Sequence, residues 1–192
     1  MIGIAIQRSM RFTTIFLLSV FLFIPYFSEC QIVINEIMAA NATSLIETDY
    51  YNFPDWLEVY HNGSSTVMLS DYFLSDDINE LKKWQFPYVS LSAGQYYVVY
   101  CDKIGTGRHT AFGLNADGET IFLSDKSGSI IDQVTYGKQF PDISYGRNPS
   151  DQGQWSYCSG PTPGGINTIT TATLQSPKAG YSVPAGRQAA VV

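Results

Sequence analysis

The stretch DWLEVYHNG, residues 55–63, decides the class of fold that this chain can adopt. Leu57 and Val59 alternate with the side chains at positions 56, 58 and 60, so the two sets point to opposite faces of an extended strand. Asn62 and Gly63 follow directly, and Asn-Gly is a residue pair that tight turns between antiparallel strands favour. A half-buried strand that ends in a tight turn predicts an antiparallel sheet.

Short apolar runs on both sides of this stretch extend the pattern. Strands are predicted at residues 32–37, 67–69, 72–74, 83–86, 96–101, 120–123, 129–134 and 154–158. The run at 96–101, YYVVYC, shows little alternation, which predicts a central strand buried on both faces. Residues 125–128 predict a hairpin turn. No window of a dozen residues after residue 30 keeps a helical period, so we expect an all-β antiparallel sandwich or barrel.

The N-terminal 30 residues have the pattern of a secretory signal peptide. Arg8 and Arg11 precede an apolar run at 12–27, and small side chains follow before Gln31, the expected first mature residue. An uncleaved membrane anchor is the alternative, but the run is shorter than the roughly 20 apolar residues that span a bilayer. Lipidation of Cys30 is a second alternative, against which Glu29 argues because a small residue is preferred there. We therefore expect a secreted or cell-envelope protein with no membrane span after cleavage.

The net charge limits which partners the protein can bind, and the cysteine content limits which disulfides it can form. The net charge is −6, without a basic cluster, which argues against nucleic acid as a partner. Beyond Cys30 the chain has Cys101 and Cys158, which in an oxidising compartment are either a disulfide pair or two separate buried thiols.

Several motifs occur in the order found in one known family. They lie at residues 34–37, 55–62, 69–77, 83–87, 91–96, 118–125, 144–147 and 161–164. Together they resemble the lamin tail domain of exported bacterial proteins, with Asp71, Cys101 and Cys158 as departures. The resemblance implies an immunoglobulin-like β-sandwich over residues 31–167 that acts in interaction or tethering.

The composition changes after Asn167. Residues 168–173 are a polar linker, and 174–192 are expected to begin a second, truncated β domain, for which residues 176–181 weakly resemble a chitobiase C-terminal-like domain. A larger secreted enzyme, either a hydrolase or a kinase similar to spore-coat protein H, is one hypothesis for what continues beyond Val192.

The residues offer no constellation for catalysis. His61 and His109 fall in predicted turns or loops and are expected at the surface, without a nucleophile motif nearby. Residues 76–80 are acidic, but turn chemistry accounts for them better than calcium binding does. Glu36 and Glu58 are interpreted as structural hydrogen-bonding residues. We predict no catalytic residue, no metal site and no cofactor.

Aromatic residues in one loop are the candidates for ligand contact. Residues 39–54 form the longest stretch without a strand pattern, and one helical turn is expected near 44–47. Tyr50, Tyr51 and Phe53 in this loop either contact a ligand or pack onto the sandwich. The three tryptophans are expected to pack within strands. The predicted function is thus a binding or tethering module for a protein or glycan at the cell surface, with a carbohydrate-binding module as an alternative; the oligomeric state is left open.

Overall fold

The computed structural model describes residues 31–148, 153–158 and 160–169. The predicted signal peptide at 1–30 with Cys30, and the predicted second β domain at 174–192, lie outside the described residues.

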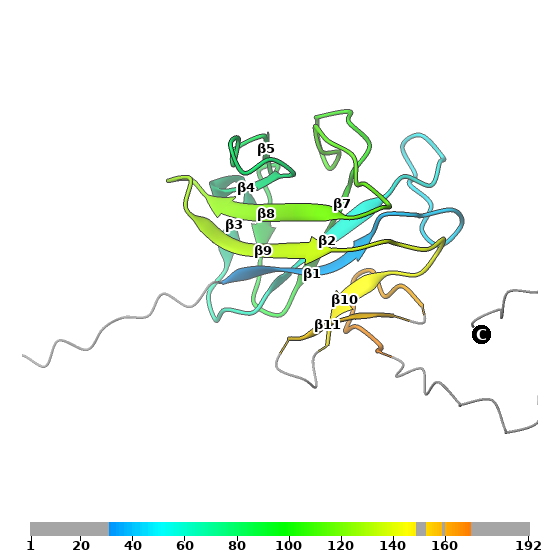
Figure 1. Ribbon diagram of the computed structural model, residues 1–192. Coiled ribbons are helices and arrows are strands. Elements are labelled where there is room, and N and C mark those ends of the chain that lie inside the picture. The colour runs from blue at the N-terminus through cyan, green and yellow to red at the C-terminus, as the bar shows by residue number, and fades with distance from the viewer. Residues whose placement is uncertain (1–30, 149–152, 159, 170–192) are drawn as a thin grey trace, which may run out of the picture.

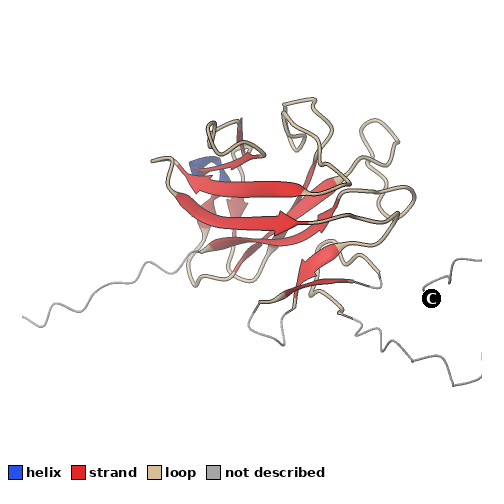
Figure 2. Ribbon diagram, in the orientation of Figure 1, coloured by secondary structure: helices blue, strands red, loops and turns tan. Residues whose placement is uncertain are grey.

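Two antiparallel sheets and a small third pair of strands make up the fold (Figures 1 and 2). The five-stranded sheet has the order β11-β10-β1-β2-β7, the four-stranded sheet has the order β5-β4-β8-β9, and β3 pairs with β6. The strands are β1 (Ile32–Met38), β2 (Trp56–His61), β3 (Val67–Met68), β4 (Tyr72–Ser75), β5 (Trp84–Gln85), β6 (Ser90–Leu91), β7 (Tyr96–Tyr100), β8 (Glu119–Asp125), β9 (Ile130–Tyr136), β10 (Tyr145–Arg147) and β11 (Trp155–Tyr157). A single 3-10 turn, η1 (Leu69–Asp71), is the helical element of the described residues. The predicted all-β sandwich is confirmed.

The core lies between the two large sheets, where β9 faces β1 (Figure 1). The alternation predicted for β2 is confirmed, because Leu57 and Val59 are buried in this core while Trp56 packs on the opposite face with Met38 and Val98. The hairpin between β8 and β9 is confirmed as well.

A bulge in β1 sets which side chains face the core. The pairing of β1 with β2 shifts between Ile34 and Glu36, so that Ile34 and Ile37 both enter the core. An unbroken strand would place residues 34 and 37 on opposite faces, since side chains alternate with a period of two. The extra residue therefore turns Glu36 away from the core and opposite Glu58 of β2.

The prediction of a central, doubly buried strand at 96–101 is wrong. β7 pairs with β2 and forms one edge of the five-stranded sheet, whereas β1 has neighbours on both sides. β7 is apolar on both faces because Val98 on its outer face packs against Trp56 and Met38, and Leu45 of the preceding loop packs against the same cluster.

The long loop at residues 39–54 is confirmed, but it contains no helical turn at 44–47. It has instead a short antiparallel bridge between Glu47 and Asn52. Sequence patterns did not predict β6 (Ser-Leu) and β10 (Tyr-Gly-Arg), because neither contains a run of apolar, β-branched or aromatic residues.

Candidate functional site

Side-chain hydrogen bonds hold the first half of the loop at 39–54 in place. The Asn41 amide nitrogen donates to the carbonyl oxygens of Leu45 (2.7 Å) and Pro54 (2.8 Å). The Asp142 carboxylate accepts hydrogen bonds from the backbone N–H groups of Thr43 (2.8 Å), Ala42 (2.9 Å) and Ser44 (3.1 Å). These donors, the Thr43 N–H first, lower the pKa of Asp142, so this carboxylate is ionised and bonded at neutral pH.

Glu47 organises the second half of the loop. Its carboxylate accepts from the backbone N–H groups of Asp49 (2.6 Å) and Tyr50 (2.7 Å). Burial of Glu47 alone would raise its pKa, but these two donors, together with His109 and the Thr48 N–H, lower it below its usual value. Tyr51, at the turn of the loop, has a φ of 55°, a left-handed conformation that is uncommon for any residue except glycine.

The predicted aromatic residues lie on the outside of this loop. Tyr50 is 58% exposed, Tyr51 78% and Phe53 40%, so packing onto the sandwich does not describe the two tyrosines. Tyr50 does make one contact, with its ring edge-on to the His109 ring at a centroid distance of 5.4 Å. The loop thus presents an apolar, aromatic surface to solvent.

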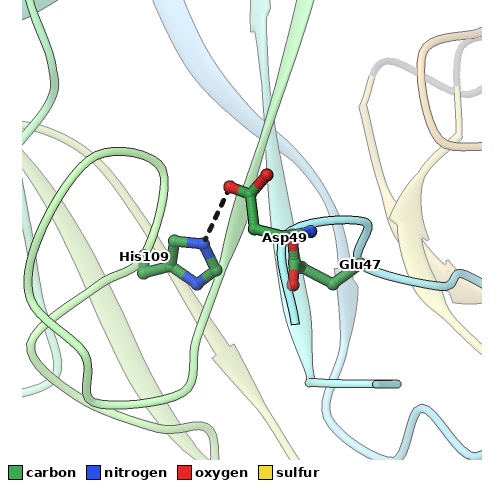
Figure 3. Close-up of side chains that lie close together, drawn as sticks. All are labelled: Glu47, Asp49 and His109. Carbon is green, nitrogen blue, oxygen red and sulfur yellow. Dashed lines mark hydrogen bonds and ion pairs between the residues drawn. The ribbon is translucent and has the colours of Figure 1, made fainter. Parts of the chain in front are cut away.

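His109 lies directly beneath this loop. The loop that follows β7 positions it, because the Tyr100 N–H donates to the Arg108 carbonyl oxygen (2.8 Å) and the Thr110 N–H donates back to the Tyr100 carbonyl oxygen (2.8 Å). The Nδ1 of His109 donates to a carboxylate oxygen of Asp102 (2.7 Å). Its Nε2 faces Asp49 at 3.9 Å, and Glu47 lies beside them (Figure 3).

The expectation that both histidines lie at the surface is wrong. His109 is buried, and His61, the last residue of β2, is fully buried. The Nε2 of His61 lies 2.6 Å from the Ser65 carbonyl oxygen, and its Nδ1 lies 2.8 Å from the Gln31 carbonyl oxygen and 3.0 Å from the Gly63 backbone nitrogen. A turn in the sequence did not imply exposure, because the turn after β2 folds back over His61 and the loop at 39–54 covers His109.

A second polar cluster lies on the outer face of the five-stranded sheet, where Glu36 of β1 is paired with Glu58 of β2. Both side chains are fully buried. Burial raises the pKa of Glu36, and it raises the pKa of Glu58 to about 7, with the neighbouring Glu36 charge adding to the increase.

Residues 160–167, which we name the strap, cover this pair of carboxyl groups. Glu36 accepts from the Thr162 N–H (3.0 Å) and from the Ser144 hydroxyl (2.5 Å). Glu58 accepts from the Gly164 N–H and from the side-chain amide of Asn35 (2.8 Å).

Asn167 closes the strap by donating to the carbonyl oxygens of Asn35 and Arg147, each at 2.9 Å. The structural role predicted for Glu36 and Glu58 is confirmed, and their pairing is an arrangement that the sequence analysis did not predict. Since both carboxyl groups are buried and bonded, they hold the strap on the sheet.

Cys101 and Cys158 are both free, buried thiols. Cys101 belongs to the core between the sheets, whereas Cys158 lies beside Gly146 on β10. Burial raises the pKa of both thiols. Of the two alternatives drawn from the sequence, two separate buried residues is the one that the structure adopts.

The remaining predicted residues have ordinary structural roles. Asp77 accepts from the N–H of Asn79 (2.9 Å) and Asp76 pairs with Lys83 (2.6 Å), which is the turn chemistry expected of this acidic segment. Trp56 and Trp84 are buried within strands, as predicted. Trp155 on β11 stacks on Tyr145 at a centroid distance of 5.4 Å.

The cluster of Glu47, Asp49 and His109 is absent from the predicted sites. About sixty residues separate the two carboxylates from the histidine in the sequence, so no spacing motif connects them. The nearest signal was the position of all three in segments without a strand pattern.

Comparison with known proteins places the fold in a family. Among curated proteins, none matches the chain. In the part of the chain that the structure describes, no helix has the length and apolar character needed to cross a membrane. The family model of the lamin tail domain, a non-catalytic immunoglobulin-like module, matches residues 27–138, more than half of the 192 residues. The sheet continues past that match, since β10 and β11 complete it. The chain belongs to the lamin tail domain family.

Proposed function

We propose that this chain is a non-catalytic binding module, exported to the cell surface or beyond, that docks a partner protein on the loop carrying Tyr50, Tyr51 and Phe53. The observation that carries the proposal is the exposure of these three aromatic side chains on a loop whose backbone is already fixed. Tyrosine anchors binding surfaces because it offers a large amphipathic contact area with few rotatable bonds.

A fixed loop reduces the entropic cost of binding, because little backbone needs to be ordered when the partner arrives. The bonds of Asn41, Glu47 and Asp142 supply that order in the free protein. The backbone of Tyr51 adds to this argument. A non-glycine residue in the left-handed region costs on the order of 1–3 kcal/mol and is typical of functional positions.

Photo-crosslinking in the source cells tests the proposal. A benzophenone amino acid in place of Tyr51 is compared with the same group in place of Tyr88, which is 83% exposed and lies between β5 and β6. We expect a crosslinked product at position 51 that position 88 does not give. Excess wild-type protein should compete it away, and the Tyr51→Ala variant should not. Identical products from the two positions, or none from either, would refute the proposal.

A carbohydrate-binding module is the alternative function, because exposed aromatic rings also stack on sugars. Retention on a polysaccharide resin that is lost in the Tyr50→Ala and Tyr51→Ala variants would favour it over a protein partner. If these variants are retained as strongly as the wild type, the loop has no role in glycan binding.

Export is part of the proposal and rests on the basic start, apolar middle and small-residue end of residues 1–30. The mass of the mature N-terminus tests it. A chain that begins at Gln31 supports cleavage and free secretion, a lipid on Cys30 supports anchoring, and an intact Met1 would contradict both. A catalytic domain beyond Val192 stays a prediction.

A further inference from the structure

We propose that Glu47, Asp49 and His109 bind one divalent transition-metal ion, and that Zn²⁺ fits this set of ligands best. The candidate ligand atoms of the three side chains all lie within 4.8 Å of one another. They come from two loops, the loop at 39–54 and the loop after β7, so a bound ion would join them (Figure 3).

The hydrogen bond to Asp102 orients the His109 ring. Because a carboxylate only accepts, the hydrogen bond to Asp102 places a proton on Nδ1 and, in the neutral ring, leaves the lone pair on Nε2. A carboxylate that orients a histidine through its second nitrogen is the usual arrangement behind a metal-bound imidazole. Asp102 would serve here as that positioning residue.

The other ring nitrogen of His109, Nε2, faces Asp49. The His109 side chain is only 6% exposed, and its Nε2 points toward the Asp49 carboxylate at 3.9 Å (Figure 3), beyond hydrogen-bond distance. An ion between Nε2 and this carboxylate would bridge a separation that a direct hydrogen bond does not. Rings of Tyr50 and Tyr100 flank His109, each at 5.4 Å, and fix its orientation.

The two carboxylates supply negative charge and oxygen ligands. Each oxygen of Glu47 accepts one backbone N–H, which leaves a further lone pair for a metal ion. The Asp49 side chain is exposed and can therefore rotate toward an ion. Solvent reaches the cluster on the side of Asp49, so a water molecule could serve as the fourth ligand.

The spacing requires only a small adjustment. Ligand atoms about 2.1 Å from a tetrahedral zinc ion lie roughly 3.4 Å apart. Rotation of the exposed Asp49 side chain can close the difference, whereas the buried His109 and Glu47 keep their positions. Imidazole with carboxylates favours zinc and related transition metals over calcium, which takes oxygen ligands alone.

The test measures the affinity of the full chain, without an affinity tag, for Zn²⁺ by calorimetry, with Ca²⁺ as a parallel titration. Asp49→Asn removes an exposed ligand and should leave the fold intact. Asp117→Asn changes another exposed aspartate, in a different loop, and serves as the matched control. We expect one zinc ion per chain, at least tenfold weaker binding in Asp49→Asn and Glu47→Gln, and unchanged binding in the control.

Asp102→Asn should weaken zinc binding by about 10–100-fold, the usual effect of removing a group that orients a histidine ligand. Substitution of Co²⁺ should give a visible absorption band that Asp49→Asn shifts or abolishes. The proposal is overturned if the wild type binds no zinc, if Asp49→Asn and Glu47→Gln bind it as the wild type does, or if Ca²⁺ binds as tightly as Zn²⁺.

Discussion

The pair of buried glutamates should make the stability of this protein depend on pH in a predictable direction. Burial raises the pKa of Glu58 to about 7 in the folded chain, against 4.5 for a glutamate side chain in water. The folded state therefore holds a proton that the unfolded state releases between these two values. The stabilising contribution is fully present below about pH 4.5 and is lost as the pH rises through about 7.

The size of the effect follows from the same two values. Linkage gives a loss of about 2.5 kcal/mol in the free energy of unfolding between pH 5 and pH 8. Other groups titrate over the same range, so the wild type is compared with Glu58→Gln, whose side chain has nearly the same shape and does not titrate. Urea denaturation at four pH values, followed by tryptophan fluorescence, measures both proteins.

We expect the stability of the wild type relative to Glu58→Gln to fall by about 2.5 kcal/mol from pH 5 to pH 8. Glu80→Gln, an isosteric change at an exposed glutamate, should track the wild type throughout. Parallel curves for the wild type and Glu58→Gln, or a wild type whose stability relative to Glu58→Gln rises toward alkaline pH, would refute the raised pKa. Faster amide exchange of Gly164 at pH 8 than expected from its intrinsic rate would locate the loosening at the strap.

Three further changes test the core, the strap and the aromatic loop. Leu57→Ala should cost about 2–5 kcal/mol in denaturant unfolding, because the side chain is fully buried between the sheets; a loss below about 1 kcal/mol would contradict that position. Gly146→Ala should destabilise by about 1–3 kcal/mol, since an added Cβ would lie 2.6 Å from the Asn167 amide nitrogen; Gly137→Ala, where nothing lies within 4 Å, is the control, and equal effects would argue against the close approach. Tyr51→Gly should raise the thermal midpoint or leave it unchanged, because glycine adopts the φ of 55° without strain; a clear loss of stability would mean that the ring packs on the loop.

Local patterns were enough for most of the strands. The alternation around Leu57 and Val59 predicted which face of β2 is buried, because a period of two is a property of the chain itself. The same reasoning failed for β7. Whether a strand is central or at an edge depends on which distant segments pair with it, and β1 took the central place by pairing with β10 near the other end of the sheet.

In the candidate site, too, some features could be predicted from local sequence and others depended on contacts between distant segments. The exposure of Tyr50 and Tyr51 agrees with ligand contact, one of the two alternatives that the sequence left open for this loop. Burial of His109 could not be predicted, since it depends on a loop sixty residues earlier that folds over it. No sequence period relates such segments.

The class of fold, the positions of the longer strands and the lamin tail family could be predicted from the chain alone, because they follow from short-range alternation, turn residues and ordered motifs. The placement of Glu36 opposite Glu58, and of His109 against Asp49 and Glu47, follows from the folded arrangement and not from any local pattern. The physical reason is that one bulged residue sets the register of a strand, and that loop closure brings together charges whose separation along the chain carries no information.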